Sequence, residues 1–169
     1  MLTKDFEKLP NNARVWVYGA DRRIDGDPEK TLLGQVDNYL TDWKAHGLPL
    51  TAGRDWRENR FLTIAVDQNQ AGASGCSIDG LFRTLKSLEK KVGAGIVTSG
   101  LIFYRDKQGE IQAVSRDDFS DAATRGEVDA DTEVFDLSVT TLGEWRARFA
   151  SPAGASWHSV LLPASAHGQ

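Results

Sequence analysis

The chain has 169 residues, of which 40% are hydrophobic and 26% charged, which is ordinary for one globular domain or one domain with a small appendage. The net charge is −4 and acidic and basic residues alternate along the chain, which argues against the basic face of a nucleic-acid-binding protein. One cysteine excludes an internal disulfide, and no apolar run approaches the length of a membrane span, so we expect a cytoplasmic protein.

The first predicted elements are a strand, a helix and a weaker strand. Residues 14–20 are β-branched and aromatic and predict the first strand. Asp27-Pro28-Glu29 supplies an N-cap, a proline at the first helical position and an acid in the first turn. Apolar residues recur at helical spacing as far as Trp43, which predicts a helix that lies on a sheet. Residues 50–56 predict the second strand, before a turn at Glu58-Asn59.

The strongest signal in the chain is a strand, a loop and a helix in succession. Residues 60–67 are nearly all apolar and predict a central strand. A regular helix is predicted from Cys76 or Ser77 to Val92. With a further strand at 101–105, the order of elements becomes that of a ferredoxin-like plait, and the predicted fold class is α+β. Several other α+β folds share this order.

The loop of small residues between this strand and helix is the predicted binding site. A helix start carries unpaired N–H groups and the positive end of the helix dipole, so the loop is suited to an anion. A cysteine at a helix start has a lowered pKa. The alternative is structural: a serine N-cap, a glycine turn and a small buried cysteine. The predicted ligand-binding residues are Gly72, Ser74, Gly75, Cys76, Ser77 and Asp79.

No complete catalytic set is recognisable. A cysteine phosphatase loop needs an arginine six positions after the cysteine, where this chain has Phe82. An enzyme acting on an anionic small molecule would use Cys76 as its nucleophile, with Asp67 as a base and His46 or His158 as a partner. Asp67 also has a simpler role, because aspartate often ends a strand. The histidines and acids lack the spacing of metal ligands, so neither a metal nor a cofactor is predicted.

The second half of the chain predicts short elements after a glycine-rich stretch. Residues 93–100 are the candidate boundary or hinge. Residues 101–105 and 111–114 predict a hairpin. Capping boxes that begin at Ser115 and at Thr141 predict two short helices.

Residues 101–135 combine this hairpin with three further segments, Val114 to Phe119, Ala123 to Val128 and Asp131 to Phe135. This part of the chain resembles the GYF-like domains of bacterial proteins, in which a strand pair leads to a short helix, a glycine, an aliphatic residue and an Asp-Thr-x-Val strand. The Gly-Tyr-Phe signature and the Gly-Pro that usually follows the turn are absent. Eukaryotic relatives bind proline-rich peptides through an aromatic patch, so the resemblance implies a unit that binds a protein partner.

Other segments resemble a family of uncharacterised bacterial proteins of similar length, sometimes labelled ABC transporter ATPases; they are residues 14–18, 43–47, 71–79 and 156–158. The sequence does not support that label. A P-loop ends in Gly-Lys followed by Ser or Thr, whose backbone and lysine hold phosphates, whereas residues 72–79 have the glycines without the lysine.

The predicted organisation is an α+β core over 1–98, a GYF-like unit over 99–150 packed on it, and a tail over 151–169 that docks in part. We expect Trp157 to be buried and His158 to lie near the Cys76 loop. The favoured function is a non-catalytic cytoplasmic protein that binds a protein partner or a small anionic ligand, not nucleic acid. The alternative is an enzyme acting on an anionic small molecule at the glycine-rich loop.

Overall fold

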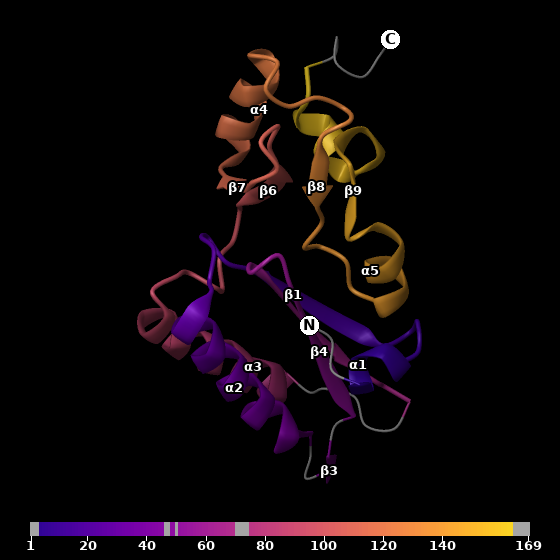
Figure 1. Ribbon diagram of the computed structural model, residues 1–169. Coiled ribbons are helices and arrows are strands. Elements are labelled where there is room, and N and C mark those ends of the chain that lie inside the picture. Colours follow the sequence, from indigo (N-terminus) through magenta and orange to yellow (C-terminus); the bar gives the residue numbers. More distant parts are fainter. Residues whose placement is uncertain (1–3, 46–47, 50, 70–74, 164–169) are drawn as a thin grey trace. The chain divides into compact units, whose positions relative to one another are not determined.

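The computed structural model describes residues 4–45, 48–49, 51–69 and 75–163 (Figure 1), with the side chains of 6–43, 51–69 and 78–163. The chain divides into two compact units, one of Met1–Thr98 with Ser138–Ala147 and one of Ser99–Leu137 with Arg148–Gln169. The segment Ser138–Ala147, which the sequence analysis assigns to the second part, therefore belongs to the first unit. The fold class is α+β, as predicted.

The first unit is built on a three-stranded antiparallel sheet. Strand β5 (Phe61–Val66) is buried along its whole length and lies between β1 (Arg14–Gly19) and β4 (Ala52–Arg57), so the predicted central strand is confirmed. The ferredoxin-like plait is wrong for two reasons. Strands β1 and β5 pair antiparallel, whereas the split βαβ unit of the plait makes them parallel. The strand expected to complete the plait, β6 (Ile102–Arg105), belongs to the sheet of the second unit.

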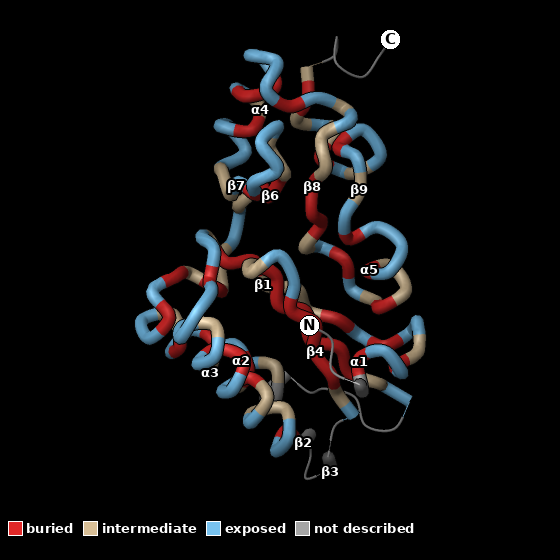
Figure 2. The backbone as a smooth tube through the Cα atoms, viewed as in Figure 1, coloured by how far each residue is buried: buried red, intermediate tan, exposed pale blue. Residues whose placement is uncertain are grey.

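Helices cover both faces of this sheet. On one face, α2 (Gly26–Thr41) and α3 (Gly75–Val92) contribute Leu32, Val36, Leu81 and Leu85 to a core with Leu62, Ile64 and Val66 of β5. Helix α2 begins two residues earlier than predicted, with Asp25 rather than Asp27 at the N-cap position. The other face is covered by α1 (Lys4–Lys8) and α5 (Leu142–Arg148), where Phe6 packs edge-on against Trp145 at 5.1 Å between ring centroids. Four consecutive buried residues of β4, whose side chains alternate between the two faces of the sheet, appear red in Figure 2.

Close backbone contact fixes α1 against β4. A Cβ atom on Gly53 would lie 2.5 Å from the backbone nitrogen of Phe6, so this position has room for glycine alone. After α2 a separate two-stranded hairpin forms from β2 (Lys44–Ala45) and β3 (Leu48–Pro49).

The predicted turn at Glu58-Asn59 is confirmed and joins β4 to β5. Both residues have positive φ, 58° and 56°, as the two central residues of a type I′ turn do, and the backbone N–H of Arg60 donates to the carbonyl of Arg57 at 3.2 Å. The amide group of Asn59 donates to Oε2 of Glu29 at 2.7 Å, and the indole N–H of Trp56 donates to the same oxygen at 2.9 Å. The Glu29 carboxylate therefore ties the end of the hairpin to α2.

The capping box at Thr141 is confirmed, and its helix α5 is part of the first unit. The hydroxyl of Thr141 accepts the backbone N–H of Glu144 at 3.2 Å, and the Glu144 carboxylate accepts the backbone N–H of Thr141 at 3.2 Å. Main-chain bonds hold the helix start to β1: Val15 donates to the carbonyl of Thr140 and Leu142 donates to that of Ala13, both at 2.9 Å.

Two acidic side chains hold the glycine-rich stretch after α3. Glu89 accepts the backbone N–H groups of Ile96 and Val97 at 2.6 and 3.1 Å. Asp21 accepts the backbone N–H of Gly95 at 3.0 Å. The stretch is thus fixed to the first unit up to the boundary at residue 98.

Replacing Glu89 with alanine is expected to lower the free energy of unfolding by about 1–3 kcal/mol, because two backbone N–H groups lose their acceptor. Burial opposes the charged form, but the N–H groups of Ile96 and Val97 and the ammonium of Lys86 bring the pKa of Glu89 below its usual value. A carboxyl group whose pKa is lower in the folded state stabilises the fold at pH values above its unfolded-state pKa. That stabilisation is lost as the pH falls through its folded-state pKa.

Urea unfolding at about pH 7 and about pH 3 measures this effect, since the gap between wild type and Glu89→Ala should narrow at the lower pH. Glu89→Gln, which keeps one acceptor oxygen, is the matched control and should lose less. A gap that is constant with pH would show that the carboxylate charge has no part in holding this stretch.

The second unit is built on a four-stranded antiparallel sheet in the order β7-β6-β8-β9. The predicted hairpin, helix and strand appear in that order, so their existence is confirmed. The elements are β6, β7 (Ile111–Val114), α4 (Arg116–Thr124), β8 (Glu133–Phe135), β9 (Ala150–Pro152) and two 3-10 helices, η1 (Ala153–Ala155) and η2 (Trp157–Leu161).

Ser115 is the N-cap of α4, at the helix start that the sequence predicts. The Ser115 hydroxyl accepts the backbone N–H of Asp118 at 3.0 Å. The helix then buries Phe119 in a core with Ile102, Tyr104 and Val134. None of the helices in the described part of the chain is long and apolar enough to cross a membrane.

Candidate functional site

Part of the predicted glycine-rich binding site lies outside the described residues. Gly72 and Ser74 fall outside them altogether, and so does His46. Gly75, Cys76 and Ser77 form the first turn of α3, as predicted, but only their backbone is described. Asp79 is exposed on the same helix. Anion binding by this loop stays a prediction.

Asp67 lies at the end of β5, half-buried, and has a structural role there. Its Oδ1 accepts the backbone N–H of Asn69 at 2.8 Å, and its own N–H donates to the carbonyl of Thr51 at 2.9 Å. An aspartate that bonds the backbone two residues on is a turn former. These bonds fit the simpler of the two roles that the sequence left open.

His158 is buried inside the second unit. Its Nδ1 lies 2.7 Å from the hydroxyl of Ser156, and its ring stacks on Trp157 with centroids 4.0 Å apart and packs edge-on against Phe119. Burial lowers the pKa of His158 to about 4, against the opposing charge of Asp136, so the ring is neutral near pH 7. These contacts give the side chain a packing role, and its proximity to Cys76 stays a prediction.

The expectation that Trp157 is buried is wrong, since the side chain is 36% exposed. The segment forms the 3-10 helix η2, in which residues three apart share one side. Trp157 and Val160 therefore point outward together, the latter 76% exposed, while His158 points inward. The guanidinium of Arg116 lies 5.1 Å from the centroid of the Trp157 ring, as in a cation–π contact.

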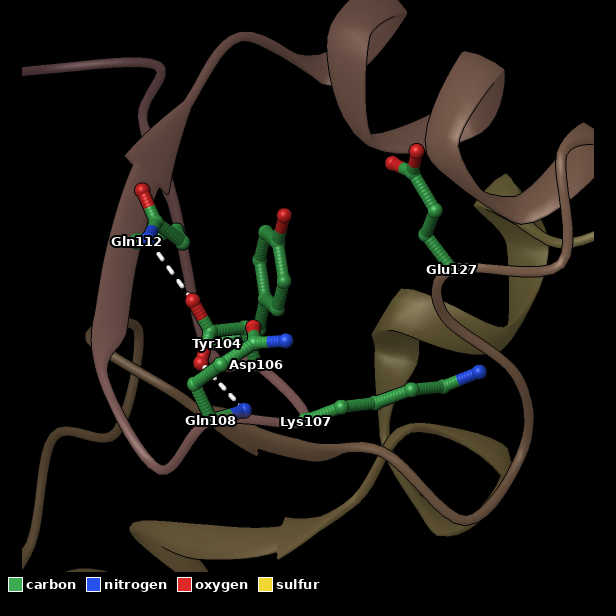
Figure 3. A pocket seen from close by; sticks show the side chains of 6 residues that line it. All are labelled: Tyr104, Asp106, Lys107, Gln108, Gln112 and Glu127. Carbon is green, nitrogen blue, oxygen red and sulfur yellow. Dashed lines mark hydrogen bonds between the residues drawn. The ribbon is translucent and has the colours of Figure 1, made fainter.

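A polar hollow of about 290 Å³ opens in the second unit beside the β6–β7 hairpin (Figure 3). The sequence analysis did not identify it, because its residues come from a turn, two strands and the loop after α4. They are Tyr104, Asp106, Lys107, Gln108, Gln112 and Glu127.

Asp106 organises the hairpin side of the hollow. Its Oδ1 accepts the backbone N–H groups of Gln108 and Glu110, both at 2.9 Å, and its Oδ2 accepts the side-chain amide of Gln112 at 2.8 Å. These bonds, that from Gln112 first, hold the pKa of Asp106 below its usual value, so the side chain is a carboxylate at neutral pH. The one sequence signal is an aspartate three positions before Gly109, which has a φ of 85°.

Tyr104 projects its hydroxyl into the hollow (Figure 3). It lies directly opposite Gln112 across the hairpin, so both side chains stand on the same face, and its ring packs edge-on against Phe119 at 5.5 Å. Burial, and then the charges of Glu127 and Asp106, raise the pKa of Tyr104, so the hydroxyl stays protonated. Among the described residues, no hydrogen bond joins this hydroxyl to another residue.

Glu127 and Lys107 supply the other two charged groups that line the hollow. The guanidinium of Arg125 donates to both oxygens of Glu127, at 3.1 and 2.9 Å, and lowers the pKa of that carboxyl. The ammonium of Lys107 donates to the carbonyl of Gly126 at 3.2 Å. The hollow therefore presents a neutral phenol and two carboxylates that are already ionised, which suits binding through hydrogen bonds better than proton transfer.

A second hollow of about 420 Å³ lies on the first unit between α2 and α3. Its polar rim consists of exposed side chains of α2, so we consider it the weaker candidate. It is lined by Gln35, Asn38, Tyr39, Asp42, Trp43 and Thr84.

The described residues contain no group of three or more His, Cys, Asp or Glu side chains placed to hold a metal ion. Comparison of the chain with protein-family models, with curated proteins and with solved structures finds no match.

Proposed function

We propose that this is a non-catalytic cytoplasmic protein whose second unit, a GYF-like module, binds an extended segment of a protein partner. The order β6-β7-α4-β8, the order that the resemblance implies, supports this proposal. The outward pair of Trp157 and Val160 adds exposed apolar surface to the same unit.

The hydroxyl of Tyr104 is the observation that carries the proposal. A nearly buried phenol normally has a hydrogen-bond partner, and this one faces an open hollow instead. Water can fill that role in the free protein, and a ligand group that replaces the water gains a hydrogen bond in a partly desolvated place. The fixed charges of Asp106 and Glu127 give the hollow the few convergent polar groups that orient a ligand.

Selection of short random peptides displayed on phage against the full chain tests the proposal. A selected peptide, titrated into the isotope-labelled full chain, should shift the backbone amide signals of residues 104–112 and 125–127. Tyr104→Phe, which keeps the ring on Phe119, should weaken binding about tenfold through the lost hydrogen bond. Shifts confined to the first unit would refute the proposal.

Replacing Cys76 with alanine is expected to leave the affinity for the selected peptide unchanged, because Cys76 belongs to the first unit. Isothermal titration calorimetry measures this affinity, and the amide spectrum of the variant shows that it is folded. A folded Cys76→Ala variant that no longer binds would instead support a site at the start of α3.

A further inference from the structure

Strand β7 forms one edge of the four-stranded sheet, and no strand of the described residues pairs with its outer side. Hydrogen-bonded and non-hydrogen-bonded pairs alternate along an antiparallel hairpin. Here the backbone N–H of Asp106 donates to the carbonyl of Glu110 at 2.7 Å, which makes Tyr104 and Gln112 the next bonded pair. The backbone N–H and C=O groups of Ile111 and Ala113 therefore point away from β6.

The residues of β7 leave this edge available for pairing with another strand. Natural edge strands are protected by proline, by charged side chains or by bulges, and Ile111-Gln112-Ala113-Val114 has none of these. The opposite edge strand, β9, contains Pro152. An open edge with a regular register is a template for strand addition by an extended peptide.

The polar hollow lies on the Gln112 face of this edge. Alternate side chains of a strand added to β7 would stand on the same face as Gln112. The carboxylates of Glu127 and Asp106 are opposed by the charges of Arg125 and of Lys107, which lines the same hollow. A long side chain that passes over Gln112 would enter the hollow that the Glu127 carboxylate and the Tyr104 hydroxyl line.

We propose that the partner segment adds as a strand along β7 and places an arginine in the hollow, where its guanidinium meets the Glu127 carboxylate and the Tyr104 hydroxyl. This inference rests on the proposed function and specifies its ligand. Arginine fits better than lysine because its planar fork can donate to a carboxylate and a hydroxyl at once. A carboxylate that already accepts from Arg125 still has lone pairs for a second donor.

Two arrays of immobilised random peptides test whether the hollow prefers an arginine side chain. One array has arginine fixed at the central position, and the other has citrulline, which has the same shape without the charge. The full chain should bind the arginine array at least about tenfold more strongly, and Glu127→Gln should remove that preference. Glu110→Gln, which neutralises an exposed acid of the same hairpin outside the hollow, is the matched control and should change neither signal.

The strongest arginine peptide then tests the strand addition. Methylation of its backbone amides one at a time should weaken binding at every second position, because only alternate N–H groups of an added strand face β7. Ala113→Pro removes an outward N–H without touching the bonds to β6, and should abolish binding in a protein whose amide spectrum remains folded.

The outcomes separate this inference from the proposed function. Peptides that bind the second unit without an arginine preference, or without the alternating effect of methylation, overturn the inference and leave the proposed function standing. No binding to the second unit from either array overturns both. A wild-type dimer that Ala113→Pro converts to a monomer would also overturn it, since the edge then pairs with a second copy of the chain.

Discussion

Replacing Phe119 with alanine is expected to destabilise the second unit by about 3–5 kcal/mol, among the largest effects of any single substitution in the chain. Phe119 is completely buried and packs edge-on against both Tyr104 and His158. Its removal leaves a cavity in the core of the unit and takes away the ring that holds Tyr104 beside the hollow. Peptide affinity should therefore fall together with stability.

Amide hydrogen exchange followed by mass spectrometry locates this effect. Faster exchange is expected in β6, β8 and α4, with little change in β5 of the first unit. Phe119→Leu is the matched control and should cost only about 1 kcal/mol, since it keeps most of the apolar volume. An equal rise of exchange in β5 would show instead that the two units unfold as one cooperative body.

Replacing Arg57 with alanine is expected to cost about 3 kcal/mol, because it leaves a buried carboxylate without its charge partner. The Asp55 side chain is 1% exposed, and the Arg57 guanidinium donates to both of its oxygens at 2.6 and 3.1 Å. The guanidinium also lies 4.3 Å from the centroid of the Trp145 ring. Because Arg57 itself is 42% exposed, we place the cost at the low end for a buried ion pair.

A double-mutant cycle distinguishes the cost of burying the Asp55 carboxylate without its ion-pair partner from the cost of the packing that is lost with Arg57. The Asp55→Ala, Arg57→Ala double variant has no carboxylate to bury, so it should be more stable than Arg57→Ala alone by at least about 1 kcal/mol. Urea unfolding followed by circular dichroism measures all the variants. A double variant no more stable than Arg57→Ala would mean that the cation–π contact with Trp145, rather than the ion pair, stabilises this face.

Local signals allowed much of the fold to be predicted. The apolar run of β5, the helix starts at Ser115 and Thr141 and the turn at Glu58-Asn59 each depend on residues within a few positions of one another, and all are confirmed. The short strand β4 was weakly signalled and lies within about two residues of its predicted start. Such features can be predicted from the sequence because residues close together in the chain form them.

Pairings between distant residues could not be predicted. Helical periodicity shows that Leu142 and Trp145 are buried, but not that they lie beside Ala13 and Phe6. The antiparallel pairing of β1 with β5 was missed for the same reason, since the order of elements is compatible with several topologies.

The candidate site was missed because each of its residues is ordinary by itself. Tyr104 is one of several aromatic residues on strands, and Asp106 resembles any aspartate that opens a turn. Only the register of the hairpin places Tyr104 opposite Gln112, and only the fold of the loop after α4 brings Glu127 to them. Trp157 was misassigned because an apolar tail segment gives no sign of which residues a 3-10 helix turns outward.

The discontinuity of the first unit sets the order in which the protein is completed during synthesis. Residues 1–98 supply its sheet, but α5, which covers one face, comes from Ser138–Ala147. A ribosome adding roughly 5–20 residues per second needs several seconds to make the roughly forty residues between them. During that interval the face of β5 that will meet α5 is uncovered, so a nascent chain paused in the hairpin or in α4 is the form most exposed to chaperones and to aggregation.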